Sequence, residues 1–137
     1  MRSLTKAATM LLGAAATLAV LPVSPASADN GNNQPGCSRG EICFWWDTGT
    51  RFQKQFWYTG NHGGNNFMDG TSVSRLPVQD NARDVTNRDT DCQVRVGNLG
   101  NGLWTWVYIP NDGKRYFLSL VNNRNDRHER VGAPGCV

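Results

Sequence analysis

The chain has 137 residues with 14 basic and 11 acidic side chains, a length and a charge balance that suit one small domain. The basic residues form no Lys/Arg block, which argues against nucleic acid as the main partner. No apolar run reaches the ~20 residues that a membrane-spanning helix needs, so the sequence predicts no membrane span.

The first 28 residues have the pattern of a secretory signal peptide. Arg2 and Lys6 give a positive start, residues 7–21 are apolar without a charge, and residues 26–28 have the small-x-small pattern that signal peptidase cuts. We therefore expect a secreted, extracellular protein whose mature chain begins at Asp29. Cleavage leaves 109 of the 137 residues and no attachment to a membrane.

The cysteines predict a disulfide-stapled domain. Three pairings of four cysteines are possible; the short spacing of Cys37 and Cys43 favours a small ring, which leaves Cys92 for Cys136. A zinc site at the near pair would need further ligands close in sequence, and none are present. We expect no metal and no cofactor.

The polar residues 29–36 should form a flexible leader before an ordered domain over residues 37–137. This domain shows strands and turns without the periodicity of a helix. Residues 103–109 alternate aromatic and aliphatic side chains, as in a strand with an aromatic face. The turn at Asp112-Gly113 predicts a hairpin with a returning strand over residues 116–121. Residues 52–59 should form the corresponding first-half strand, whereas residues 60–66 are too rich in Gly and Asn to be one.

Two copies of one pattern cover the domain, at residues 43–87 and 92–131. Each copy runs from a cysteine through a strand, a bend and an aromatic strand to a polar segment, at residues 79–87 and 125–131. Units of about 40 residues with four short strands have the size of one Greek key, and two such units pack as a sandwich. The predicted fold class is all-β.

The export signal, the C-x5-C ring leading into an aromatic strand, and the repeated Asn/Asp-rich segment resemble the bacterial secreted peptidase-inhibitor family with the βγ-crystallin fold. The resemblance spans residues 37–131 and implies a βγ-crystallin-like sandwich of two Greek-key motifs. It also implies a proteinaceous inhibitor of a secreted metalloprotease. We expect the protein to be a monomer. The family's reactive bond lies beside a second close cysteine pair, which this chain lacks, so no reactive bond is assigned.

Calcium-binding members of the crystallin fold use two Asn/Asp residues followed at fixed spacing by serines. Asp80 and Asp126 occupy the acidic places and are the calcium candidates here, but Arg83 and Arg130 stand in the serine places, where a guanidinium repels a cation. We expect these aspartates to order their loops through backbone hydrogen bonds. A non-inhibitory binding or calcium-binding surface module is the alternative function.

An enzyme is not expected, because a carboxylate, a histidine and an arginine would have to converge on one cleft. His128 and Glu129 are consecutive, so a strand would point them to opposite faces. His62, in a Gly/Asn-rich stretch, is expected to be a solvated loop residue and a contact candidate. Most tryptophans should fill the core, but Trp45 and Trp46 are adjacent and must diverge, so these two complete the candidate contact surface.

Overall fold

The computed structural model describes residues 31–136, which form two antiparallel sheets and no α-helix. The predicted all-β class is therefore confirmed, and both predicted disulfides are present, Cys37 with Cys43 and Cys92 with Cys136. The predicted signal peptide lies outside the described residues. No helix within residues 31–136 is long and apolar enough to cross a membrane.

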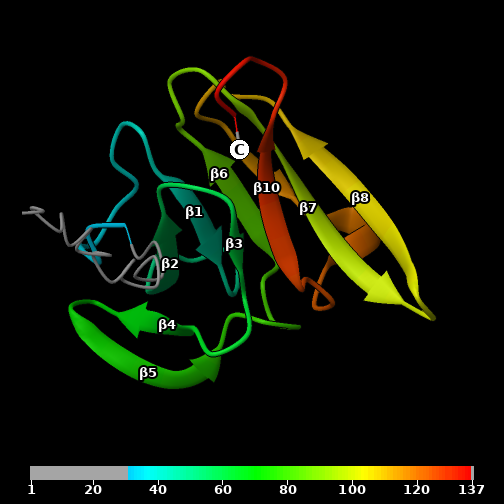
Figure 1. The fold of residues 1–137 in the computed structure, drawn as a ribbon. Helices are drawn as coiled ribbons and strands as arrows, with labels where there is room; N and C mark the ends of the chain where they lie inside the picture. Colours follow the sequence, from blue (N-terminus) through cyan, green and yellow to red (C-terminus); the bar gives the residue numbers. More distant parts are fainter. Residues whose placement is uncertain (1–30, 137) are drawn as a thin grey trace, which may run out of the picture.

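The larger sheet has six strands in the order β5-β4-β2-β1-β6-β9, and the smaller has four in the order β3-β10-β7-β8 (Figure 1). The strands are β1 (Ile42–Trp45), β2 (Phe52–Phe56), β3 (Gly60–Asn61), β4 (Asn66–Asp69), β5 (Ser72–Pro77), β6 (Asp84–Asn87), β7 (Gln93–Gly100), β8 (Leu103–Ile109), β9 (Arg115–Phe117) and β10 (Arg127–Val131), with the 3-10 helix η1 (Ser119–Val121) between β9 and β10.

The two halves of the chain follow the same strand order. In the first half β2, β1 and β6 lie side by side, and in the second half β8, β7 and β10 do. Each half also contributes one strand to the other sheet: β3 pairs with β10, and β9 pairs with β6. The β4–β5 hairpin extends the first sheet without a counterpart in the second. The halves are therefore interlocked through exchanged strands.

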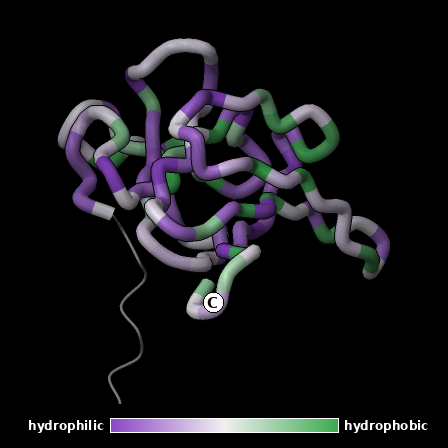
Figure 2. The backbone as a smooth tube through the Cα atoms, turned by 90° about the horizontal axis from the view of Figure 1, so that it is seen from above, coloured by the Kyte–Doolittle hydropathy of each residue, from purple (hydrophilic) through white to green (hydrophobic). Residues whose placement is uncertain are grey.

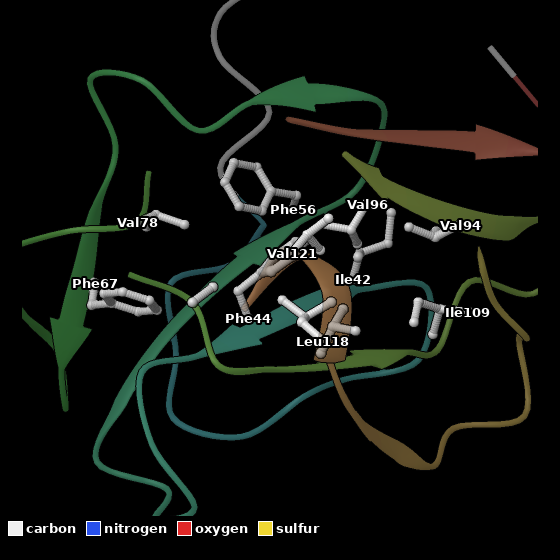
Figure 3. Close-up of a cluster of buried hydrophobic side chains, with 12 residues drawn as sticks. Ile42, Phe44, Phe56, Phe67, Val78, Val94, Val96, Ile109, Leu118 and Val121 are labelled. Atoms are coloured by element: carbon white, nitrogen blue, oxygen red, sulfur yellow. The ribbon is translucent and has the colours of Figure 1, made fainter. Parts of the chain in front are cut away.

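Aliphatic and aromatic side chains from both sheets fill the space between them (Figure 3). Alternate residues of β1, Ile42 and Phe44, face alternate residues of β7, Val94 and Val96, as the two-residue period of a strand requires. The remaining core residues are Phe56, Phe67, Val78, Ala82, Val85, Ile109, Leu118 and Val121. The core thus draws on both halves of the chain.

Most tryptophans lie outside this core, contrary to the prediction. Trp46, Trp57 and Trp104 are 38–46% exposed, and Trp106 is partly exposed. Figure 2 shows hydrophobic residues at the outer margin of the molecule as well as inside it. Trp104 and Trp106 stack on each other over Gly97, on the outer face of the second sheet. A thin sandwich filled by smaller side chains leaves the indoles to cover outer surfaces.

The predicted hairpin after β8 is wrong, because the strand that follows the turn does not pair with β8. The chain does turn at Gly113, whose φ is +73°, but β9 then pairs with β6 of the other sheet, with Tyr116 opposite Val85. Residues 119–121 form η1 rather than the end of a returning strand. The turn residues specify a reversal of the chain, but not which sheet receives the next strand.

Residues 32–36 pack against the outer face of β2 rather than extending freely as a leader. The side-chain amides of Gln53 and Gln55 both donate to the carbonyl of Gln34, at 3.2 and 2.7 Å, and Gln55 also donates to the carbonyl of Gly36 at 3.0 Å. The two glutamines are themselves buried. This segment therefore covers the outer side of β2.

Candidate functional site

Trp45 ends β1, and Trp46 begins the loop that follows. Trp45 is 6% exposed and lies on the outer face of the first sheet, where its Nε1 donates to Oγ1 of Thr86 at 3.3 Å and the guanidinium of Arg115 lies 4.6 Å above its ring. Trp46 is 39% exposed. Of the two contact candidates, Trp46 is the one that a partner can reach.

The loop at residues 46–51 joins β1 to β2 and is held by its own hydrogen bonds. The amide of Trp46 donates to the carbonyl of Phe52 at 3.2 Å, which closes the base of the loop. Within the loop, Oδ1 of Asp47 accepts the amide of Gly49 at 2.7 Å, in an Asx turn. Residues 48–51 are exposed. The loop therefore has a fixed base and an accessible tip.

Arg115 of β9 fixes the loop from the second half of the chain. Its guanidinium donates to the carbonyl of Gly49 at 2.7 Å and to the carbonyl of Asp47. The same group donates to the carboxylate of Asp84 at 3.0 Å, and the side chain of Asp84 is only 8% exposed. Because the carboxylate of Asp84 is shielded from solvent, this pair orients the guanidinium towards the loop more firmly than a fully exposed pair would.

An open apolar groove of about 390 Å³ adjoins the loop, lined by Trp46, Phe52, Ser74, Arg75 and Leu76. Trp46 and Phe52 contact each other edge to face, with ring centroids 5.6 Å apart. The groove thus joins the loop to a surface that accepts an apolar side chain.

Arg51 closes the loop at its second end. Its guanidinium lies 5.0 Å from the ring centre of Phe52 and makes a two-pronged ion pair with Asp69, at 2.8 and 2.7 Å. Hydrogen bonding from Arg51 lowers the pKa of the Asp69 carboxyl, so the pair is charged at neutral pH. Since Arg51 is largely exposed, the pair orients the loop but adds little stability.

His62 is not part of this surface, and the prediction of a solvated contact residue is wrong. Its ring is fully buried, and its Nε2 lies 2.9 Å from Nδ1 of His128, which is also fully buried. Nε2 of His128 lies 2.6 Å from the carbonyl of Tyr58, and Nδ1 of His62 lies 2.6 Å from Nδ2 of Asn125. Gly60 makes room for this pair, because a Cβ there would stand 3.1 Å from His128. Neither imidazole is open to a substrate.

Burial shifts the titration of both histidines. Desolvation lowers the pKa of His128 to about 4. The hydrogen bond to the carbonyl of Tyr58 raises this pKa, and the positive charge of Arg127 lowers it further. Desolvation is also the main reason why the pKa of His62 lies well below its ordinary value, and the charge of the neighbouring His128 lowers it further. Both rings are therefore neutral in the folded protein at neutral pH.

The cysteine-rich N-terminal ring does not offer a metal site. Cys37, Glu41 and Cys43 lie close together, but the two sulfurs are bonded to each other. The buried carboxylate of Glu41 instead accepts the amides of Asn32 and Ser38, at 3.1 and 2.6 Å. This group of residues therefore orders the entry into β1.

Asp80 and Asp126, the calcium candidates, are electrostatic neighbours from the two halves of the chain. Partial burial, and then the charge of Asp126, raise the pKa of the Asp80 carboxyl. The oxygens of Asp126 accept the side-chain amide of Gln79 at 2.8 Å and the backbone amide of Leu99 at 2.7 Å. Asp126 thus joins its own loop to Gln79 of the first half and to Leu99 of β7.

No protein-family model matches the chain, and neither a curated protein nor a solved structure is significantly similar to it.

Sequence patterns do not reveal the part that Arg115 plays in this site. Its loop partners, Gly49 and Asp47, lie 66 and 68 positions away in the chain, so no local motif reports the contact. The contact results from the exchange of β9 between the halves, which brings an arginine of the second half beside a loop of the first half. That exchange becomes visible only once both sheets are assembled.

Proposed function

We propose that this protein is a secreted peptidase inhibitor with a βγ-crystallin-like fold, and that the loop at residues 46–51 blocks the cleft of a metalloprotease. Two disulfides are consistent with export, because such bonds persist in oxidising compartments. The contact surface consists of the loop and its groove.

The strand order supports the two-motif fold. A Greek key places its fourth strand beside its first. With the extra β4–β5 hairpin set aside, β6 is the fourth strand of the first half and lies beside β1, as β10 lies beside β7 in the second half. In each half the third strand, β3 or β9, joins the other sheet. This arrangement is what two interleaved four-stranded motifs produce, as the resemblance to crystallin-type inhibitors implies.

The observation that carries the inhibitor proposal is the pinning of the loop by Arg115. A loop whose carbonyls are already held loses little conformational entropy when it enters a protease cleft. If the loop were cut, the ends would stay in place, because Arg115 and the bond between Trp46 and Phe52 hold both sides. Product would then leave slowly, and the protease would remain blocked.

The groove supplies the anchoring surface. Trp46 and Phe52 offer aromatic area beside the loop, and Arg51, paired with Asp69, lies beside the ring of Phe52 at its end. Residues 60–66, the other Gly- and Asn-rich segment of the first half, contain β3 and the buried ring of His62, and so are a poor match for a cleft. The alternative function, a non-inhibitory binding or calcium-binding module, would use the same fold without protease inhibition.

Two matched variants test the role of the loop. Arg115→Ala removes the guanidinium that holds the loop and pairs with Asp84, whereas Arg83→Ala removes the other guanidinium on Asp84, 3.3 Å away. We expect Arg115→Ala to weaken inhibition of a thermolysin-like protease by roughly tenfold or more, because the freed loop must be ordered on binding. Arg83→Ala should weaken it far less.

Inhibition constants and melting temperatures of both variants check this prediction. A similar loss of inhibition in the two variants would show that the charge balance at Asp84 matters and that the loop does not. Intact inhibition in a folded Arg115→Ala protein would likewise reject the loop as the inhibitory element.

A further inference from the structure

The two sheets have four edges, and three of them carry features that prevent pairing with another strand. β3 has two residues and β9 has three, and Lys114 and Arg115 place charge at the start of β9. β5 ends in Pro77, contains Arg75 and has an irregular register with β4. Short, charged, bulged and proline-containing edges are the usual protection against association.

β8, the fourth edge, lacks all of these features. It has seven residues, Leu-Trp-Thr-Trp-Val-Tyr-Ile, without a charge or a proline. Its register with β7 is continuous from Val94 opposite Ile109 to Gly100 opposite Leu103. The strand order ends at β8, which lies at the outer side of the molecule in Figure 1.

The unpaired backbone groups of β8 follow from the turn that precedes it. Asn101 and Gly102 have φ values of +52° and +77°, as in a two-residue hairpin turn whose flanking pair, Gly100 and Leu103, exchanges hydrogen bonds. Alternate residues of an antiparallel strand then face opposite partners. The amides and carbonyls that point to the open edge are those of Trp104, Trp106 and Tyr108.

We propose that a second copy of this chain pairs with this edge, β8 against β8, to give a two-fold symmetric dimer with one continuous sheet across both copies. Antiparallel pairing centred on Trp106 matches every open backbone group of one copy with one of the other. The opposed side chains are then Trp106 with Trp106, Trp104 with Tyr108, and Thr105 with Val107. These are aromatic and β-branched pairs, the combinations that stabilise neighbouring strands.

Self-pairing fits this edge because the strand is uncharged, so two copies do not repel each other. Leu103 and Tyr108 are 75% and 59% exposed, and pairing removes apolar surface from water. The other edge of the same sheet is the two-residue β3, so assembly stops at two copies and does not continue into a fibre. A dimer would differ from the monomer expected from the sequence. It would be a weak one, because one strand pair buries less area than a standard interface.

Sedimentation equilibrium of the exported, oxidised protein from micromolar to millimolar concentration tests the dimer. Thr105→Lys places a charge at the exposed centre of the edge and should weaken association by about tenfold or more. Val73→Lys adds the same charge to the exposed β5 edge and should leave association unchanged. A monomer at all concentrations, or a dimer that Thr105→Lys leaves intact, would overturn the proposal.

Amide hydrogen exchange of the unmodified protein gives a second test that needs no variant. The amides of Trp104, Trp106 and Tyr108 should gain protection as concentration rises, whereas those of Thr105 and Val107 should be protected throughout. Equal behaviour of the two sets would contradict the pairing. Protection that appears only on addition of an extended peptide, in a chain that stays monomeric, would also contradict it and would identify a foreign strand as the occupant.

Discussion

The free energy of unfolding is expected to fall by roughly 3 kcal/mol between about pH 6.5 and pH 5, because two histidines are buried as neutral rings. The carbonyl of Tyr58 can only accept a hydrogen bond, so Nε2 of His128 carries the proton and its Nδ1 accepts from Nε2 of His62. Nδ1 of His62 then accepts from the amide of Asn125. A proton added to Nδ1 of His62 would displace the side-chain amide of Asn125, and the acceptor left to it is the backbone carbonyl of Asn125, 3.4 Å away.

The sign of the effect follows from the direction of the two pKa shifts. In the unfolded chain both histidines take up protons as the pH falls through their ordinary pKa, near 6.5. In the folded protein the pKa of His128 is about 4 and that of His62 lies well below its ordinary value. The unfolded state therefore binds more protons, and each histidine lowers stability by up to about 1.4 kcal/mol per pH unit once the pH is below the ordinary pKa.

Urea unfolding at a series of pH values measures this slope. His128→Gln removes one titrating ring but keeps an amide that can donate to Tyr58, so the variant should be less stable at neutral pH yet lose only about half as much stability on acidification. An unfolding free energy that stays flat from neutral pH to about pH 5 would contradict the buried neutral pair. So would an unchanged slope in His128→Gln.

Removal of the Cys92–Cys136 disulfide is expected to cost about 4 kcal/mol, a large part of the stability of a domain this small. The two cysteines are separated by 44 positions, and the bond fixes the end of the described chain to the segment before β7. In the chain-entropy account, a long closed loop restricts the unfolded state strongly. The variant Cys92→Ala/Cys136→Ala should therefore unfold at much lower urea concentration.

The Cys37–Cys43 disulfide provides the matched control. Its cysteines are separated by 6 positions, so the same account assigns its loss roughly 2 kcal/mol. Equilibrium unfolding of Cys37→Ala/Cys43→Ala gives the comparison. If the short ring proved as costly to remove as the long one, packing around the fully buried Cys43 would outweigh loop closure.

Features with a local signal were predictable from the sequence. The alternation of residues 103–109 predicted β8 with its bounds as observed, and the spacing of the cysteines favoured the two disulfides that are present. The divergence of Trp45 and Trp46 followed from the two-residue period of a strand. These features depend on neighbours in the sequence, and a single chain is enough to show them.

Features that depend on distant contacts were missed. His62 has the sequence context of a solvated loop residue, yet the fold buries it against His128, 66 positions away. Tertiary pairing, and not propensity, makes β3 from Gly60 and Asn61, because the edge of β10 accepts them. Arg115 reaches its loop for the same reason, since strand exchange between the halves brings β9 beside β6.

Titration of the exported, oxidised protein into assays of a thermolysin-like and a subtilisin-like protease tests the inhibitor proposal most directly. The account predicts inhibition of the metalloprotease at micromolar concentration, with the chain recovered uncut or cut only within residues 46–51 and still bound. Full activity of both proteases at that concentration, or rapid digestion of the chain, would contradict it.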